Sequence, residues 1–238
     1  MRQDYFLTHY SQYIGDEFTY LRNQAGVYRR QFFKKLQEHK CFPDIKVLDI
    51  CCGVGDFCYF LQEIGCTDVT GIDSSMESIK FCKSNFPDYK FYYADAFEFL
   101  KNNTEQYDVV SMFSCLEHFK KDDIVSILFQ VKTILNLEGL FLLSTPNMDC
   151  LFSNTSGRYG DFTHEVGFTR SSLEQVLKEA GFKTITIFGT KRSSSNIFQF
   201  LFYKIYQPAA LKVLSILFRS LSLKFPEIYD YVLWATVQ

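Results

Sequence analysis

Short apolar runs alternate with helical segments from residue 45 onward, and this order constrains the fold more than any other feature of the sequence. The runs are rich in β-branched and aromatic residues and cover residues 45–50, 68–73, 90–95, 107–113, 137–145 and 183–188. Strands that alternate with helices favour a parallel sheet with right-handed crossovers and with ligands at the carboxyl ends of the strands. A chain of 238 residues has room for one decorated domain, so we predict a single α/β domain.

Pairs of polar residues mark where several helices are expected to begin. They stand at 74–75, 122–123 and 171–172, each directly before a helical segment. Ser and Asp at such positions accept hydrogen bonds from the first free N–H groups of a helix. The segment from Ile124 to Leu135 repeats its apolar residues at i, i+3 and i+4 spacing, which predicts an amphipathic helix that covers a sheet.

The segments outside the alternation predict how the domain is divided. We expect an aromatic N-terminal helical cap over residues 1–40, a cofactor-binding core over 41–190, a helical insertion over 191–228 and a last strand over 229–238. Residues 146–170 within the core are rich in Gly, Ser, Asn and Thr and predict a long functional loop.

Residues 197–221 within the insertion are apolar and basic. Lys204, Pro208 and Lys212 interrupt this stretch, which is therefore too polar for a helix that spans a bilayer. The pattern predicts either a lid over a pocket or a helix that lies on a membrane surface, as a possible peripheral contact.

Charge is unevenly distributed along the chain. Residues 1–40 carry 7 Lys and Arg against 4 Asp and Glu, residues 41–178 carry 11 against 20, and residues 179–238 carry 7 against 3. An acidic centre repels phosphates, so nucleic acid is not an expected partner. The basic, aromatic flanks favour an acceptor that is anionic or contains a ring.

The cysteines and the N-terminal sequence together indicate the cellular compartment of the protein. Most of the eight cysteines lie inside apolar runs and none forms a C-x-x-C pair, so we expect reduced, buried thiols. The opening MRQDYFLTHYSQYIGDEF has no uncharged apolar stretch of the kind that signal peptides contain, which predicts a cytoplasmic protein.

A glycine-containing turn carries the clearest chemical signal. The run 47–50 leads into Cys51-Cys52-Gly53-Val54-Gly55 and then a helix, an arrangement that lets backbone N–H groups approach a ligand. The dinucleotide pattern G-x-G-x-x-G fails because Cys58 stands at its third glycine. Asp73, which ends the next strand, can accept from both ribose hydroxyls. These features allow any adenosine-type cofactor, and NAD-dependent oxidoreductase remains an alternative.

Four motifs in order resemble those of class I S-adenosylmethionine-dependent methyltransferases. They read LDICCGVGDF, GIDSS, YADAF and YDVVSMFSCLEHF. The resemblance implies a Rossmann-like seven-stranded, mostly parallel sheet of order 3-2-1-4-5-7-6 with helices on both faces, an N-terminal helical extension and a helical insertion before the last strand. It also implies S-adenosyl-L-methionine as cofactor, S-adenosyl-L-homocysteine as product, and an enzyme.

The same resemblance implies which residues contact the cofactor. Asp49 and the turn face the methionine part, Asp73 binds the ribose, Asp95 with Ala96 contacts the adenine, and Phe113 with Ser114 lies beside the transferable methyl. The full expected set is Asp49, Cys51, Gly53, Gly55, Asp73, Ser74, Met76, Asp95, Ala96, Phe113 and Ser114. Cys51 stands where the family usually has its first glycine.

The motif LEHF and the segment GDFTHEVGFT resemble a narrower group, the ubiquinone-biosynthesis O-methyltransferases and the methyltransferases of bacterial surface-polysaccharide pathways. This resemblance implies that Glu117, His118 and His164 approach the acceptor, and either histidine is a candidate general base. Some members hold a divalent metal with a Glu three residues before Glu117; Ser114 stands there, so we expect no metal. The structural alternatives are a helix cap for His118 and a loop hydrogen bond for His164.

The predicted function is therefore O-methylation of a small sugar-, nucleotide- or phosphate-bearing metabolite of surface glycan assembly, such as capsule or lipopolysaccharide. A quinol or phenol O-methyltransferase at the membrane surface is the alternative. A domain that binds cofactor without catalysis is a further one.

Overall fold

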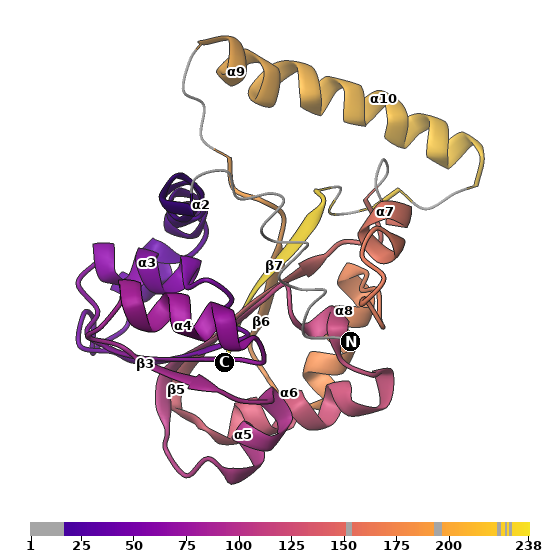
Figure 1. Ribbon diagram of the computed structural model, residues 1–238. Helices are drawn as coiled ribbons and strands as arrows, with labels where there is room; N and C mark the ends of the chain where they lie inside the picture. Colours follow the sequence, from indigo (N-terminus) through magenta and orange to yellow (C-terminus); the bar gives the residue numbers. More distant parts are fainter. Residues whose placement is uncertain (1–16, 151–153, 193–196, 223–224, 227, 229) are drawn as a thin grey trace.

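A seven-stranded sheet organises the computed structural model, which describes residues 17–150, 154–192, 197–222, 225–226, 228 and 230–238. The strand order is β3-β2-β1-β4-β5-β7-β6, and Figure 1 shows the sheet between its helices. The strands are β1 Lys46–Ile50, β2 Asp68–Asp73, β3 Lys90–Tyr93, β4 Tyr107–Phe113, β5 Leu135–Pro146, β6 Ile185–Phe188 and β7 Val232–Val237. Only β7, among the pairings of these strands, runs antiparallel to its neighbours β5 and β6. The predicted fold class and strand order are confirmed.

Helices cover both faces of the sheet. They are α2 Glu17–Gln37, α3 Asp56–Glu63, α4 Met76–Asn85, α5 Ala96–Asn102, η1 Leu116–His118, η2 Lys121–Asp123, α6 Ile124–Thr133, α7 Asn154–Tyr159, α8 Arg170–Glu179, α9 Ile197–Leu201, η3 Phe202–Tyr206 and α10 Gln207–Ser220. One core cluster joins α2, α3 and α4 to strand residues such as Val47, and the other joins α5, α6 and α8 to residues such as Leu48. Adjacent strand residues face opposite layers because side chains alternate along a strand.

Local signals explain some helix boundaries and miss others. Ser75 is the N-cap of α4, as predicted, and accepts from Ser78 N–H at 3.2 Å. Helix α8 begins earlier than predicted, because Thr169 forms a capping box with Ser172. The helix predicted up to Leu135 ends at Thr133, since Leu135 already pairs with Tyr107 of β4.

The N-terminal extension and the long loop both contain helix. Helix α2 packs against α3 and buries Leu21, Ala25, Phe32 and Leu36. The loop expected at 146–170 includes α7. The aromatic residues expected in residues 1–16, and Phe152 in the loop, lie outside the described residues.

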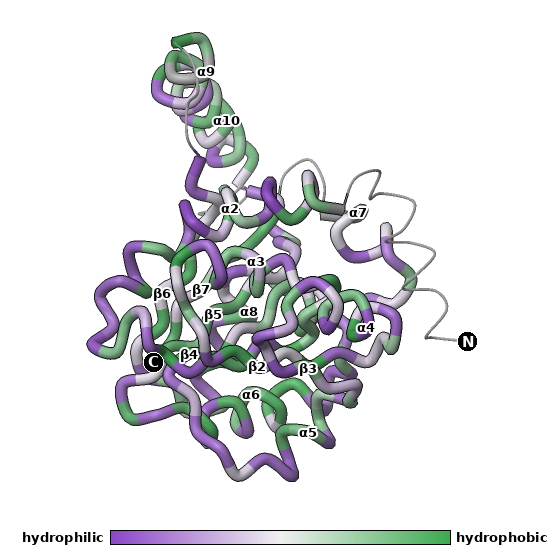
Figure 2. Tube along the Cα trace, turned by 60° about the vertical axis from the view of Figure 1, so that its left-hand side comes forward, coloured by the Kyte–Doolittle hydropathy of each residue, from purple (hydrophilic) through white to green (hydrophobic). Residues whose placement is uncertain are grey.

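The insertion before β7 forms an elongated helical arm, which we define as residues 197–221. Helices α9, η3 and α10 follow one another in it without interruption, and Figures 1 and 2 both show it standing away from the sheet. The π-helical segment η3 ends two residues before Pro208, whose ring cannot fit a regular helix interior. Across the described ranges, no helix joins the length and apolarity that crossing a bilayer requires.

Candidate active site

A cavity of about 230 Å³ opens at the carboxyl ends of β1 and β4, the edge where the sheet topology predicts ligand binding. Its lining comes from α2, the β1–α3 turn, β4, β5 and β7. The lining residues are Tyr20, Gln24, Tyr28, Asp49, Cys51, Cys52, Gly53, Val54, Asp56, Phe113, Ser114, Ser144, Val232 and Trp234. Five of the predicted cofactor residues are among them: Asp49, Cys51, Gly53, Phe113 and Ser114.

The β1–α3 turn needs left-handed backbone at three positions. Gly53, Gly55 and Cys51 have φ angles of 52°, 78° and 57°, a region that residues with a Cβ seldom adopt. A Cβ on Gly55 would lie 2.7 Å from the Phe86 ring. This geometry gives a physical reason for the glycine that the resemblance leads us to expect at Cys51.

Asp49 is a buried carboxyl group on the cavity wall. Ser111 Oγ donates to its Oδ1 at 2.7 Å, and Cys58 Sγ donates to its Oδ2 at 3.8 Å. Burial raises the pKa of Asp49 to about 8. A cationic ligand group in the cavity would favour the ionised form, so this residue is suited to bind an ammonium or sulfonium.

Asp73 connects the turn to α4. Its Oδ2 accepts from Gly53 N–H at 2.9 Å and its Oδ1 from Ser75 N–H at 2.7 Å. Burial raises the pKa of the Asp73 carboxyl. Asp73 therefore fixes the turn geometry in addition to its predicted role toward the ribose.

The other predicted cofactor residues lie outside the cavity lining. Asp95 caps α5 by accepting from Phe97 and Glu98 N–H. Ala96 is buried, and Met76 is exposed at the start of α4. These three, with Gly55, Asp73 and Ser74, are absent from the cavity wall, and their predicted contacts with a cofactor remain predictions.

Aromatic residues from the two ends of the chain close the cavity. Tyr28 of α2 packs against Phe113 and Trp234, with ring centroids 4.8 and 6.3 Å apart. Its hydroxyl donates to Asp56 Oδ2 at 2.8 Å. The aromatic excess in residues 1–40 pointed to Tyr20 and Tyr28, whereas no sequence signal singled out Asp56 or Gln24.

A disulfide at this edge of the sheet corrects one prediction. Cys51 and Cys115 are bonded, with their Cα atoms 6.2 Å apart, so the expectation of reduced thiols is wrong for these two. They are 64 residues apart in sequence, but β1 and β4 are neighbours and bring them together. The other cysteines form no disulfide in the part of the chain that the structure describes; they are Cys41, Cys52, Cys58, Cys66, Cys82 and Cys150.

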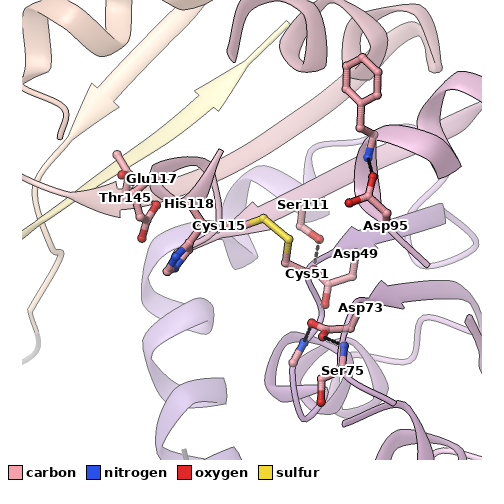
Figure 3. Close-up of a disulfide and its surroundings, with 12 residues drawn as sticks. Asp49, Cys51, Asp73, Ser75, Asp95, Ser111, Cys115, Glu117, His118 and Thr145 are labelled. Carbon is pink, nitrogen blue, oxygen red and sulfur yellow. Dashed lines mark hydrogen bonds between the residues drawn. A yellow bond between two sulfur atoms is a disulfide. The ribbon is translucent and has the colours of Figure 1, made fainter. Parts of the chain in front are cut away.

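Glu117, His118 and His164 form a cluster on the far side of the disulfide from Asp49, as Figure 3 shows for the first two. The histidine rings lie 4.8 Å apart. The cluster forms because the loop docks on η1, where the Glu117 carbonyl accepts from Glu165 N–H at 2.8 Å and Val166 N–H at 3.1 Å. None of the three lines the described cavity.

Hydrogen bonds assign the proton positions of both histidines. Thr163 Oγ1 donates to Asp161 Oδ1 at 2.7 Å, so it accepts from His118 Nδ1–H at 2.9 Å. His164 Nδ1–H donates to the Gly157 carbonyl at 2.8 Å. In the neutral form of either ring, the lone pair is therefore on Nε2. Burial and the neighbouring His164 lower the pKa of His118.

These contacts test the purely structural roles considered for the two histidines, a helix cap for His118 and a loop hydrogen bond for His164. His118 lies in η1 and contacts Thr163, while Asp123 occupies the N-cap of α6, so the helix-cap interpretation of His118 is wrong. The loop hydrogen bond considered for His164 is present.

Glu117 completes the cluster as a buried acid. Thr145 Oγ1 donates to its Oε2 at 3.0 Å, while its buried Oε1 has no hydrogen-bond partner among the described residues. Burial raises the pKa of Glu117 to about 7. One donor atom from each of Glu117, His118 and His164 lies within 4.8 Å of the others, a donor set of N and O atoms that a divalent ion could bridge.

Arg158 holds the loop in place rather than facing a ligand. Its guanidinium donates to the His164 carbonyl and, at 2.8 Å, to the Glu165 carbonyl. The neighbouring Tyr159 is exposed. These bonds keep His164 beside His118.

The fold and its family are shared with known methyltransferases. A family model described as a methyltransferase domain matches residues 20–187. An uncharacterised methyltransferase of Synechocystis sp. is 32% identical over 148 residues, which make up 60% of this chain and 69% of the relative. The family match selects the methyltransferase interpretation over the oxidoreductase that the glycine turn had left open.

Solved structures agree on the architecture. A SAM-dependent methyltransferase from Archaeoglobus fulgidus superposes with a TM-score of 0.69 at 20% identity, over 98% of this chain and 99% of the other. The plantazolicin methyltransferase BpumL with SAH has a TM-score of 0.58 at 19% identity over 99% and 89% of the two chains. The DhpI–SAH complex has a TM-score of 0.62 at 14% identity over 99% and 94%. At these identities the likeness concerns the fold, which is that of SAM-dependent methyltransferases, and the matched family model shows that this chain belongs to the methyltransferase domain family.

Proposed function

We propose that this chain transfers a methyl group from S-adenosylmethionine to a hydroxyl of a small metabolite and releases S-adenosylhomocysteine. The observation that carries the proposal is the placement of the acidic, aromatic cavity beside the cluster of Glu117, His118 and His164. The cavity and the cluster meet at the Cys51–Cys115 disulfide, so a cofactor in one and an acceptor at the other would be neighbours.

The cavity suits a cofactor with two cationic groups. Asp49 supplies a buried carboxyl group and Asp56 a partly buried one, and Tyr28, Phe113 and Trp234 supply aromatic surface, which attracts cations. Relatives of the same fold, BpumL and DhpI, were crystallised with SAH. When bound, S-adenosylmethionine supplies an electrophilic methyl group on a sulfonium.

The protein's own contribution to the reaction is alignment and proton removal. The α2 and β7 aromatics exclude water from the cavity, and the β1–α3 turn fixes one end of the ligand. His118 accepts the hydroxyl proton at Nε2, because Thr163 and Asp161 hold its Nδ1–H and burial favours its neutral form. His164 is the alternative base and carries the same tautomer.

The acceptor we favour is a sugar-, nucleotide- or phosphate-bearing metabolite of surface glycan assembly, in the cytoplasm. The motifs LEHF and GDFTHEVGFT support this class by resemblance, and the basic flanking segments favour an anionic acceptor. In this proposal residues 41–190 form the cofactor-binding core of a single domain. Tyr20, Gln24 and Tyr28 from residues 1–40 and Val232 and Trp234 from residues 229–238 complete the wall of the cofactor cavity, and residues 191–228 contribute to the acceptor side. A quinol or phenol acceptor is the second candidate, because the exposed apolar arm suits an enzyme that works at a membrane.

Thermal shift separates cofactor binding from the choice of acceptor. We expect S-adenosylhomocysteine to raise the melting temperature and NAD to leave it unchanged, because a ligand that binds the folded chain stabilises it. Stabilisation by NAD alone would overturn the methyltransferase proposal.

Histidine variants test the proposed base. Methyl transfer to nucleotide-activated sugars and to quinols would be measured for the wild type, His118→Gln and His164→Gln, with His39→Gln as control because it lies outside the cavity and the cluster. Loss of the base is expected to lower kcat by roughly 10²- to 10⁴-fold while the affinity for S-adenosylhomocysteine stays the same. Unchanged turnover in both variants would show that alignment alone drives the reaction.

Treatment with a chelator tests whether the reaction requires a metal ion. Because we expect no metal at Glu117, His118 and His164, EDTA treatment should leave the rate unchanged. Loss of activity with EDTA, restored by a divalent ion, would overturn that expectation and assign the cluster to metal binding.

A further inference from the structure

The arm concentrates the exposed apolar surface of the molecule. Within the described part of the chain, 18 large apolar side chains are exposed, and 9 of them lie in the arm. These nine are Ile197, Phe198, Phe202, Ile205, Tyr206, Val213, Ile216, Leu217 and Leu221. Neither η3 nor α10 contains a buried residue. A contiguous patch of this kind on a folded domain marks an interaction surface.

The charge of the arm and its flanks has one sign. Residues 180–226 contain no Asp or Glu and seven Lys or Arg, which are Lys183, Lys191, Arg192, Lys204, Lys212, Arg219 and Lys224. The rest of the chain is acidic, since the whole molecule has a net charge of −2. The partner surface of the arm is therefore expected to carry negative charge.

Basic residues form a narrow stripe along α10, beside a broad apolar surface. Lys212, Ser215 and Arg219 follow one another at i, i+3 and i+7, which places them in one stripe along the helix. Ile216 borders this stripe, Val213 and Leu217 lie away from it, and all three are more than half exposed. A broad apolar side with a narrow basic stripe is typical of helices that lie in the interface of a bilayer.

The arm is held at its base. Arg192 Nη2 bonds Asp230 Oδ1 at 2.6 Å, its guanidinium lies 5.4 Å from the Tyr203 ring, and its Nη1 donates to Gln207 Oε1 at 3.5 Å. Figure 2 shows the arm standing away from the rest of the chain, with green segments along its length. A helix of 24 residues is about 36 Å long, so the whole patch can lie flat on a planar surface.

We propose that the arm docks this protein on an anionic lipid bilayer, with its apolar side in the headgroup region and Lys204, Lys212 and Arg219 in contact with lipid phosphates. Three observations favour lipid over a protein partner: the apolar residues run along the full arm, every charged group in it is basic, and no polar group breaks the apolar side of α10 between Val213 and Leu217 except Ser215 on the stripe. The proposal is independent of the acceptor.

Vesicle co-sedimentation of the full chain tests the proposal. The vesicles would be phosphatidylcholine alone and phosphatidylcholine mixed with phosphatidylglycerol, at low and high salt. We expect the wild type to sediment with the anionic vesicles and to be released by salt. Protein that stays in the supernatant with both vesicles, or that binds both equally, overturns the proposal.

Matched variants identify the contact surface. Ile216→Asp/Leu217→Asp should abolish sedimentation, whereas Phe129→Asp/Leu137→Asp, which changes two exposed apolar residues outside the arm, should sediment like the wild type. Lys212→Gln/Arg219→Gln should lower the affinity for anionic vesicles roughly twenty-fivefold, at roughly fivefold for each charge. Binding of S-adenosylhomocysteine confirms that each variant is folded.

The competing hypothesis is that a second copy of the chain covers the apolar side of the arm. Light scattering of the wild type and of Ile216→Asp/Leu217→Asp distinguishes it. A dimer that the variant converts to a monomer, together with no vesicle binding, would overturn the lipid proposal and assign the arm to self-association.

Discussion

Asp49 couples the stability of the protein to pH. Its folded-state pKa is about 8 against an ordinary 3.8, so between these values the folded chain holds a proton that the unfolded chain has released. The unfolding free energy therefore falls as pH rises through this window, by about 1.4 kcal/mol per pH unit. Above pH 8 the contribution of Asp49 to the unfolding free energy no longer changes with pH.

Asp49→Asn should remove this slope and also weaken binding of a cationic ligand. The measurement is urea unfolding across the window, with calorimetric titration of S-adenosylhomocysteine. Asp122→Asn, at an exposed position, should keep the wild-type pH dependence. An unchanged slope in Asp49→Asn would show that the buried carboxyl does not control stability.

The Cys51–Cys115 bond makes stability depend on reductant. It closes a loop of 64 residues, and the chain-entropy model assigns about 4 kcal/mol to such a crosslink. Reductant should lower the melting temperature of the wild type by several degrees. The Cys115→Ser variant should melt at one temperature with or without reductant, while Cys41→Ser, which removes a free thiol, should behave like the wild type. Equal melting of the wild type under both conditions would contradict a contribution from the disulfide.

The turn between β1 and α3 is the element whose geometry matters most for the cavity. Gly55 and Gly65 both have positive φ, but a Cβ at Gly55 would meet the Phe86 ring whereas a Cβ at Gly65 would meet nothing within 4 Å. Gly65→Ala should cost about 1–2 kcal/mol of unfolding free energy from the backbone alone. Gly55→Ala should cost more, through the clash, and should weaken S-adenosylhomocysteine binding. Equal losses in the two variants would show that Phe86 moves aside freely.

Elements with a strong local pattern could be predicted from sequence. Strands β2 and β4 match the apolar runs at 68–73 and 107–113 residue for residue, because buried parallel strands read as continuous apolar runs. The start of β5 could not be placed, since Leu135 pairs across the sheet with Tyr107 while its own spacing fits the preceding helix. Tertiary pairing decided that boundary.

Among the site residues, too, some positions could be predicted from the sequence and others could not. Asp49 lies in β1 and Gly53 in the turn that follows it, and the resemblance of the motif LDICCGVGDF to class I methyltransferases implied their place at the cofactor. The Cys51–Cys115 bond and the contact of Thr145 with Glu117 join residues 64 and 28 positions apart, and only the strand order brings them together. Gln24 reaches the cavity from a helix that carries no motif, and Asp56 was not assigned a role although it lies in the motif LDICCGVGDF.

At the scale of the whole molecule, the cofactor cavity and the arm belong to different regions of the charge distribution. The cavity lies in the acidic centre of the chain and the arm in its basic C-terminal part. Opposite charges in one molecule orient it in an electric field such as that of an anionic surface. An enzyme docked through the arm would therefore hold its acidic centre away from the lipid phosphates.

The ion pair between Arg192 and Asp230 joins the two points where the chain leaves the sheet for the arm and returns to it. The strands on either side of the insertion, β6 and β7, pair with each other directly, and Phe188 lies opposite Trp234 in their ladder. The insertion therefore branches from the sheet without interrupting it. Sequence change inside the branch is thereby uncoupled from the catalytic scaffold. A shorter or exchanged insertion is therefore expected to leave the pairing of β6 with β7 in place.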